Sequence, residues 1–148
     1  MSGLLDGVRV LDLTNVLAGP YCGYQLALVG ADVIKVELPG SGDLARALGT
    51  TPALNRAKMG ASFLAQNAGK RSIEIDFKSA EGKAKFLALV ADADVLLENF
   101  RPGVMERLGL GYARLKEMKS NLTYCAISGF GQTGPLKDNP AYDQIIQG

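Results

Sequence analysis

The chain has 148 residues, of which 47% are hydrophobic and 21% are charged, a composition that suits one folded domain with a core and excludes a disordered chain. Sixteen Lys and Arg stand against fifteen Asp and Glu, and the net charge of +1 gives no field that would hold a nucleic acid or an anionic membrane surface. His is absent, which argues against metal hydrolysis and against Ser-His-Asp chemistry.

Apolar runs that alternate with segments of helical period predict an α/β fold with a Rossmann-like, mostly parallel sheet and flanking helices. We expect four strands, each ending near Gly, Asn or Ser, at residues 8–13, 33–36, 95–97 and 122–127. A fifth strand is expected at an edge of the sheet, at residues 72–76. All of these elements are assigned to one domain.

Two helices are expected between these strands. The first covers residues 19–28 and is closed by Gly30, because its early Pro suits a first helical turn and Gly suits a helix end. The second covers residues 79–91, with Ser79 as its cap, and buries one apolar face that includes Phe86.

Two segments are less regular. Residues 40–67 contain Gly-rich and Pro-containing stretches, so we expect a long connection with little fixed structure of its own. Residues 141–148 predict the opening of a helix, yet the chain stops about two turns into it, and a helix of that length is marginal in water. The sequence therefore favours a truncated chain over a naturally short one.

The cysteines and the hydropathy pattern bear on the compartment. Cys22 and Cys125 are far apart in the sequence and form no CxxC motif, which predicts reduced thiols in a cytoplasmic protein. The apolar runs are well short of the ~20 residues that a membrane span requires, so no membrane-crossing segment is expected.

A glycine pattern follows the last expected strand. Gly129, Gly131 and Gly134 form a GxGxxG, the pattern of a dinucleotide-binding fingerprint. Such a fingerprint must lead into a helix whose N-terminus holds the pyrophosphate, whereas Pro135 and Pro140 bracket a segment that is typical of turns. We therefore expect a glycine loop here rather than an NAD site.

A candidate binding segment, residues 98–103, follows the strand expected at 95–97, and open α/β sheets place ligands at the carboxyl ends of their strands. The amide of Asn99, the ring of Phe100 and the guanidinium of Arg101 suit an adenine and its phosphates. Arg107 adds a second cation one turn into the next short helix. For this segment taken alone, an ordinary loop with a solvated Arg is the favoured explanation.

Two further segments carry weaker signals. Residues 16–20 join the first strand to the first helix, so their backbone amides are placed to approach a ligand, although a tight turn explains them equally well. Lys70 and Arg71 precede the edge strand, and surface charge is the usual explanation for such a pair.

The motifs of the chain have a familiar order and spacing. They lie at residues 5–8, 10–14, 18–20, 30–37, 40–43, 70–73, 98–103, 109–112, 129–135 and 142–143. On these motifs the chain resembles, from end to end, the N-terminal part of the family III coenzyme A (CoA) transferases, a group that includes formyl-CoA and carnitine CoA-transferases and the α-methylacyl-CoA racemases. The resemblance implies that residues 1–148 form the N-terminal CoA-binding domain of that fold, without its remainder.

The resemblance also implies that CoA is bound as a substrate and that no metal is used. The CoA contacts that it assigns are Leu17, Ala18, Ile75, Lys78, Asn99, Phe100, Arg101 and Arg107, with Tyr142 at the thiol end. One departure from the family pattern is Leu38, because some relatives carry an Arg there that grips the CoA phosphates. We expect a neighbouring cation to substitute, or a lower affinity.

The family's transferases use an Asp carboxylate as nucleophile, which forms an aspartyl anhydride and then an aspartyl-CoA thioester. The resemblance places that Asp downstream of Gly148, so we expect no catalytic residue in this chain and no turnover by it alone. Asp143 is expected to be structural or to support residues that contact the substrate. The implied partners are an acyl-CoA, a carboxylic acid and, for the full-length protein, a second copy in an interlocked homodimer.

Two other functions remain open. One is a fragment of an α-methylacyl-CoA racemase, whose relatives typically carry His-Asp where this chain has Tyr142-Asp143. A phenol with a pKa near 10 is a poor base at neutral pH, so the sequence favours acyl transfer. The other is a non-catalytic, stand-alone α/β module.

Overall fold

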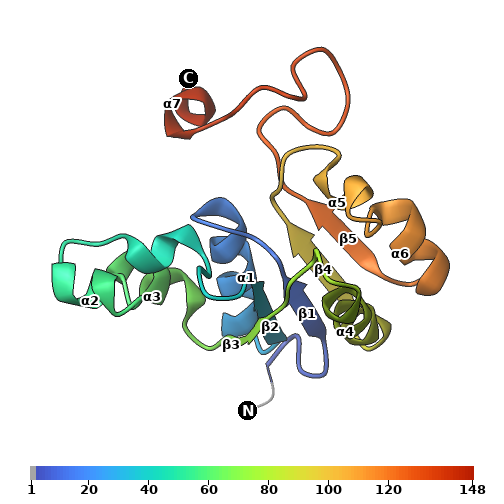
Figure 1. Ribbon diagram of the computed structural model, residues 1–148, viewed down its shortest axis with the longest axis horizontal. Coiled ribbons are helices and arrows are strands. Elements are labelled where there is room, and N and C mark those ends of the chain that lie inside the picture. Colours follow the sequence, from blue (N-terminus) through green and yellow to red (C-terminus); the bar gives the residue numbers. More distant parts are fainter. Residues whose placement is uncertain (1–2) are drawn as a thin grey trace.

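A parallel sheet organises the computed structural model, which describes residues 3–148 (Figure 1). The strands are β1 (Arg9–Asp12), β2 (Asp32–Glu37), β3 (Arg71–Glu74), β4 (Val95–Glu98) and β5 (Thr123–Ala126). All pairings are parallel, and the spatial order is β3-β2-β1-β4-β5. The predicted α/β, Rossmann-like fold is confirmed, including the edge position of the strand expected at 72–76.

The strand order reverses between β1 and β4. The chain runs outward from β1 to β2 and β3, and then returns to form β4 on the other side of β1. In open α/β sheets, the carboxyl ends of the two strands at such a switch point border the crevice in which ligands bind. The loops that follow β1 and β4 therefore define where a site is expected.

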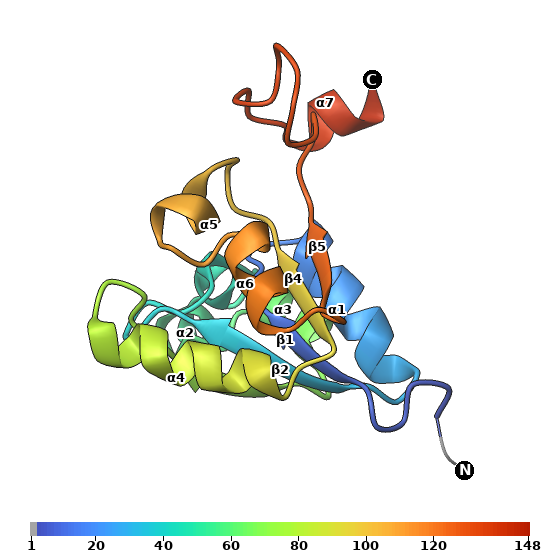
Figure 2. The same cartoon turned by 90° about the vertical axis from the view of Figure 1, so that its right-hand side faces the viewer.

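Helices cover both faces of the sheet (Figures 1 and 2). On one face, α1 (Ala18–Leu28) packs its Cys22 and Leu26 against Val10, Val33 and Leu97 of the strands. The other face carries α4 (Ala80–Ala91), α5 (Val104–Arg107) and α6 (Tyr112–Met118). Successive strand residues point to opposite faces, and this alternation assigns the apolar side chains to the two layers.

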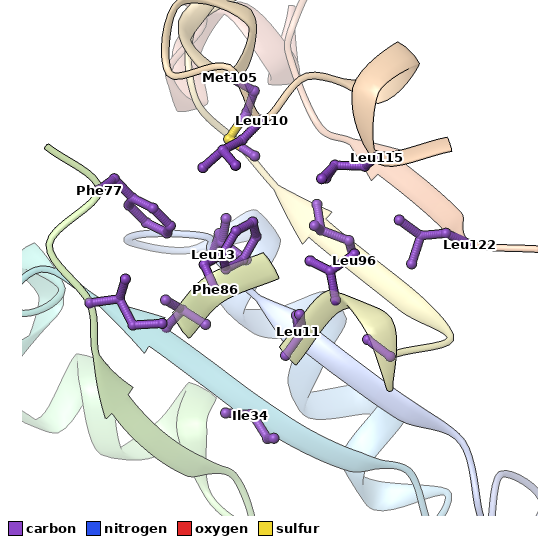
Figure 3. Packing of buried hydrophobic residues seen from close by; sticks show 14 residues of the cluster. Leu11, Leu13, Ile34, Phe77, Phe86, Leu96, Met105, Leu110, Leu115 and Leu122 are labelled. Carbon is purple, nitrogen blue, oxygen red and sulfur yellow. The ribbon is translucent and has the colours of Figure 1, made fainter. Parts of the chain in front are cut away.

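The larger core lies beneath α4 (Figure 3). Phe86 of α4 is fully buried and meets Phe77 edge to face, with the ring centroids 5.1 Å apart. Leu11 of β1 and Leu96 of β4 belong to the same cluster and are also fully buried. The predicted helix at 79–91 is confirmed, and the Ser79 hydroxyl caps it by accepting the N–H of Gly82 at 2.9 Å.

The prediction for residues 40–67 is wrong, because this segment contains three ordered helical turns. They are η1 (Leu44–Ala47), α2 (Pro52–Arg56) and α3 (Ala61–Asn67). Local signals fix their ends, since the Asp43 carboxylate caps η1 through the Ala45 N–H at 2.9 Å and Pro52 starts α2. Each helix is too short to show an apolar period. The buried ring of Phe63 on α3 packs against the Arg46 guanidinium of η1, with Cζ 3.7 Å from the ring centroid.

The C-terminal part of the chain leaves the sheet after β5. Turns cover the region of the GxGxxG, with Gly131 and Gly134 at φ of 79° and 90°, and no helix follows them directly, as predicted. The short helix α7 (Asp143–Gln147) ends this arm and stands away from the sheet (Figure 2). Within residues 3–148, no helix is both long enough and apolar enough to cross a membrane.

Candidate functional site

A side-chain bridge joins the two loops at the switch point. The Asn99 amide, directly after β4, donates from Nδ2 to the carbonyl of Asn15 at 2.8 Å and accepts the Asn15 N–H on Oδ1 at 2.8 Å. The β1–α1 loop (residues 13–17) and the β4–α5 loop (residues 99–103) are thus held side by side. An amide has two donors and two acceptor positions, so one of each remains on Asn99 for a ligand.

A buried carboxylate fixes the start of the β4–α5 loop. Glu98 at the end of β4 is buried and accepts the N–H of Phe100 on Oε2 at 2.8 Å. Its other oxygen accepts the hydroxyl of Tyr124 at 3.3 Å. Burial raises the pKa of Glu98, while these two donors act in the opposite direction. The fixed backbone leaves Phe100 half-buried against the core and Arg101 exposed.

Arg107 lies over the same loop. Gly103 precedes α5 with a left-handed φ of 79°, and a Cβ added there would lie 3.0 Å from Nη1 of Arg107. Arg101 of the β4–α5 loop and Arg107 at the end of α5 are both exposed, and Phe100, which precedes Arg101, is half-buried. Such a surface suits an anionic ligand that also carries an aromatic group.

The remaining predicted site residues are dispersed. Leu17 and Ala18 are exposed at the start of α1, on the chain segment that the Asn99 bridge holds. Ile75 is buried in the core, so its side chain does not face solvent, and the exposed Lys78 follows it near the edge strand. Tyr142 is 71% exposed on the C-terminal arm. The structure brings together the predicted residues of the two switch-point loops. Ile75, Lys78 and Tyr142 lie outside these loops.

Lys70 was predicted to be a surface charge, and this prediction is wrong. Its ammonium, with the side chain 1% exposed, donates to the carboxylate of Asp12 at 2.6 Å, to the carbonyl of Pro20 at 2.8 Å and to Oδ1 of Asn67 at 2.8 Å. Burial lowers the pKa of Lys70, and Asp12 acts against that shift. The available signal was Asp12 itself, because a carboxylate inside an apolar strand requires a cation.

Two glycines of α1 make this arrangement possible. A Cβ at Gly23 would lie 2.6 Å from Oδ2 of Asp12 and 3.1 Å from Nζ of Lys70. A Cβ at Gly19 would lie 2.2 Å from the Cβ of Thr14. Only the absence of side chains lets the first turns of α1 rest on the buried ion pair and on the β1–α1 loop.

A second buried ion pair lies on the same face of the sheet. Lys35 of β2 pairs with Asp43 at 2.9 Å, with both side chains almost fully buried, and its ammonium donates to the carbonyl of Thr14 at 2.7 Å. One oxygen of Asp43 accepts the N–H of Val16 at 3.0 Å. This ion pair therefore fixes the backbone of the β1–α1 loop at Thr14 and Val16.

A third charged group continues the row along β2. Glu37 accepts two hydrogen bonds from Arg46, at 2.7 and 2.6 Å, and one from the hydroxyl of Ser72 at 2.6 Å. Burial acts to raise the pKa of Glu37, but Arg46, Ser72 and the Asp43 N–H outweigh it and lower the pKa to about 2. The carboxylate is therefore ionised and fully engaged at neutral pH.

A cavity of about 200 Å³ opens beside Glu37, at the ends of β2 and β3. Its lining residues are Glu37, Gly40, Ser41, Gly42, Arg46, Lys58, Ser72 and Glu74. Two carboxylates and two cations balance one another there, so the cavity has no charge excess for a phosphate. Within residues 3–148, no group of three or more His, Cys, Asp or Glu side chains is arranged to hold a metal ion.

Comparison with known proteins shows one family. The family model of CoA-transferase family III matches residues 5–148. The succinate–glutarate CoA-transferase of Agrobacterium fabrum is 48% identical over 97% of this chain and 37% of its own length. The acetyl-CoA:oxalate CoA-transferase of Acetobacter aceti is 48% identical over 98% of this chain and 36% of its own length.

Solved structures agree with these relatives. A CAIB/BAIF family protein from Brucella suis superposes with a TM-score of 0.88 at 42% identity, over 99% of this chain and 39% of that one. A short chain dehydrogenase/reductase family protein at 15% identity has a TM-score of 0.51 and shares the fold alone. The chain thus spans a little more than a third of the length of the transferases named above.

Proposed function

Since the chain belongs to CoA-transferase family III, we propose that it binds CoA at the switch point between β1 and β4. The observation that carries this proposal is the Asn99 bridge, which holds the β4–α5 loop with its exposed Arg101 next to the β1–α1 loop. Arg107 of α5 adds a second exposed cation near Gly103, the last residue of that loop. CoA carries several phosphate charges on an adenosine, which matches two exposed cations beside an aromatic ring. The whole protein would move CoA between an acyl-CoA and a carboxylic acid.

In this proposal, Arg101 and Arg107 bind the phosphates, while Phe100 and the free positions on the Asn99 amide face the adenosine. Leu17 and Ala18 form the wall contributed by the β1–α1 loop. Lys78 and the backbone of Ile75 follow β3, which β2 separates from the switch point, so they contribute only to a part of CoA that extends across the end of β2. Tyr142 reaches the thiol end only if the C-terminal arm lies closer to the sheet than it does in this structure.

The chemistry that the family resemblance implies starts with attack of an Asp carboxylate oxygen on the acyl-CoA carbonyl carbon. The C–S bond breaks, CoA leaves as a thiolate, and an aspartyl anhydride remains. The buried carboxylates beside the switch point are already engaged, because Asp12 pairs with Lys70 and Asp43 pairs with Lys35. We therefore assign no nucleophile to this chain, whose role is to recognise CoA.

The binding proposal is tested by calorimetric titration of the chain with CoA. Replacing both Arg101 and Arg107 by Gln is expected to raise the Kd at least about tenfold, because a hydrogen bond to a charged group contributes roughly 1.5–3 kcal/mol. The affinity of the unchanged chain should also fall as salt is added, since exposed charges are screened.

The matched control replaces Arg114 and Lys85 by Gln, which removes the same charge from exposed positions on α6 and α4. This double variant should keep the Kd of the unchanged chain. Equal weakening by both double variants would show a nonspecific charge effect. Absence of any CoA heat from the unchanged chain would overturn the binding proposal.

The absence of a nucleophile has its own test. Incubation of the 148-residue chain with acetyl-CoA and oxalate should give no oxalyl-CoA by liquid chromatography. The Acetobacter aceti relative, whose name states this reaction, serves as the positive control. Product formation by the chain alone would show that one of its own side chains carries the reaction.

A further inference from the structure

The β1–α1 loop contains a backbone conformation that its sequence does not favour. Val16 has a φ of 72°, in the left-handed region that a β-branched residue rarely adopts. Strained residues of this kind persist only where the surrounding structure holds them, and they are concentrated at functional sites.

This strain is not offset by burial of the side chains in the loop. Val16 is 41% exposed and Leu17 is 48% exposed, although both are apolar. A strained backbone in a core normally places a side chain into the packing, and here the side chains face solvent. The conformation therefore serves the exposed surface of the loop rather than the interior.

Every residue from Thr14 to Leu17 has a backbone group bonded to a side chain. Asp12 accepts the Thr14 N–H at 2.9 Å, and Lys35 donates to the Thr14 carbonyl. Asn99 binds both backbone groups of Asn15. These bonds come from β1, β2 and the end of β4.

The strained residue itself is held from both ends. Asp43 accepts the Val16 N–H at 3.0 Å. With its amide oriented so that both polar atoms are satisfied, Gln66 of α3 donates to the carbonyls of Val16 at 2.8 Å and Leu17 at 3.2 Å. Side chains from several neighbouring elements thus fix the backbone conformation of the loop.

We propose that Asp43 is a positioning residue that keeps the β1–α1 loop in its ligand-ready conformation by holding the N–H of left-handed Val16. Asp43 is 1% exposed, so it does not touch a ligand. It connects three elements, because it also caps η1 through the Ala45 N–H and pairs with Lys35. That CoA is the ligand rests on the proposed function; the hold on the loop does not.

The test combines Asp43→Leu, which removes the oxygen that accepts the Val16 N–H, with Val16→Gly, because glycine adopts a positive φ without strain. If loss of the carboxylate leaves the loop ligand-ready about a tenth of the time, the Kd for CoA rises about tenfold. In the Val16→Gly background, the same Asp43→Leu change should raise the Kd much less. General destabilisation by Asp43→Leu would not be relieved by a glycine at this one position.

Asp43→Leu leaves Lys35 without a counter-ion, so a second variant that removes no charge is needed. Gln66→Met deletes the donor to the Val16 and Leu17 carbonyls, and Gln25→Met on the exposed side of α1 is its control. Gln66→Met should weaken CoA binding, and Gln25→Met should not. Circular dichroism confirms that each variant is folded.

Amide hydrogen exchange at Val16 separates this inference from the proposed function, because it needs no ligand. The Val16 N–H should exchange faster in Asp43→Leu, which has no acceptor at that position, or, if that variant does not fold, in Gln66→Met. An unchanged exchange rate in a folded variant would overturn the positioning role, whether or not CoA binds. A failed CoA titration with a faster exchange rate would overturn only the proposed ligand.

Discussion

Replacing Lys70 by Met is expected to lower the free energy of unfolding by about 3–5 kcal/mol, the range found when one partner of a buried ion pair is removed. The methionine keeps the length of the side chain, but Asp12 is then a buried carboxylate without a counter-ion. The carbonyl of Pro20 also loses its donor. Urea denaturation followed by circular dichroism measures the change.

The control is Lys85→Met, which removes a lysine of the same kind from an exposed ion pair with Glu81 on α4. Exposed pairs at this spacing contribute only about 0.3–0.5 kcal/mol, so the control should be nearly neutral. The double variant Lys70→Met with Asp12→Leu should recover part of the lost stability, because neither charge of this pair then remains buried, although the Thr14 N–H loses its acceptor. Similar losses for Lys70→Met and Lys85→Met would contradict the buried pair.

Truncating Phe86 to Ala is expected to lower the free energy of unfolding by about 3–5 kcal/mol. Phe86 is fully buried between α4 and the sheet and packs on Phe77, so its removal loses apolar burial and leaves a cavity. Leu28→Ala is the control, since Leu28 is 60% exposed on α1 and its change should stay within about 0.5 kcal/mol. A loss for Phe86→Ala as small as for the control would show that α4 does not pack on the sheet in solution.

Much of the fold follows from local pattern. The apolar runs predicted strands at 8–13 and 122–127, and the structure has β1 and β5 inside these ranges. The cap at Ser79 and the apolar face of the next helix predicted α4. The prediction for residues 40–67 was wrong because three short helices carry too few residues to show a helical period of apolar side chains. Their order depends on contacts with distant parts of the chain.

The candidate site was predictable in place but not in detail. A loop after a central strand of an open sheet is a recognised ligand position, which identified Asn99 and Arg101. The sequence did not reveal that the Asn99 amide binds the backbone of Asn15, because the partners are 84 residues apart. The burial of Lys70 was not predicted for the same reason, since its partner Asp12 lies 58 residues away in the sequence.

The bridge between Asn15 and Asn99 has a consequence for the folding of the chain. Its two loops meet only after β4 has added to β1, a contact between distant segments that forms slowly compared with local structure. A ligand that contacts both loops therefore recognises a chain whose central strands are already assembled. Its binding energy is linked to the global unfolding transition, so it protects the entire sheet against thermal denaturation by an amount that grows with the logarithm of the ligand concentration above the Kd.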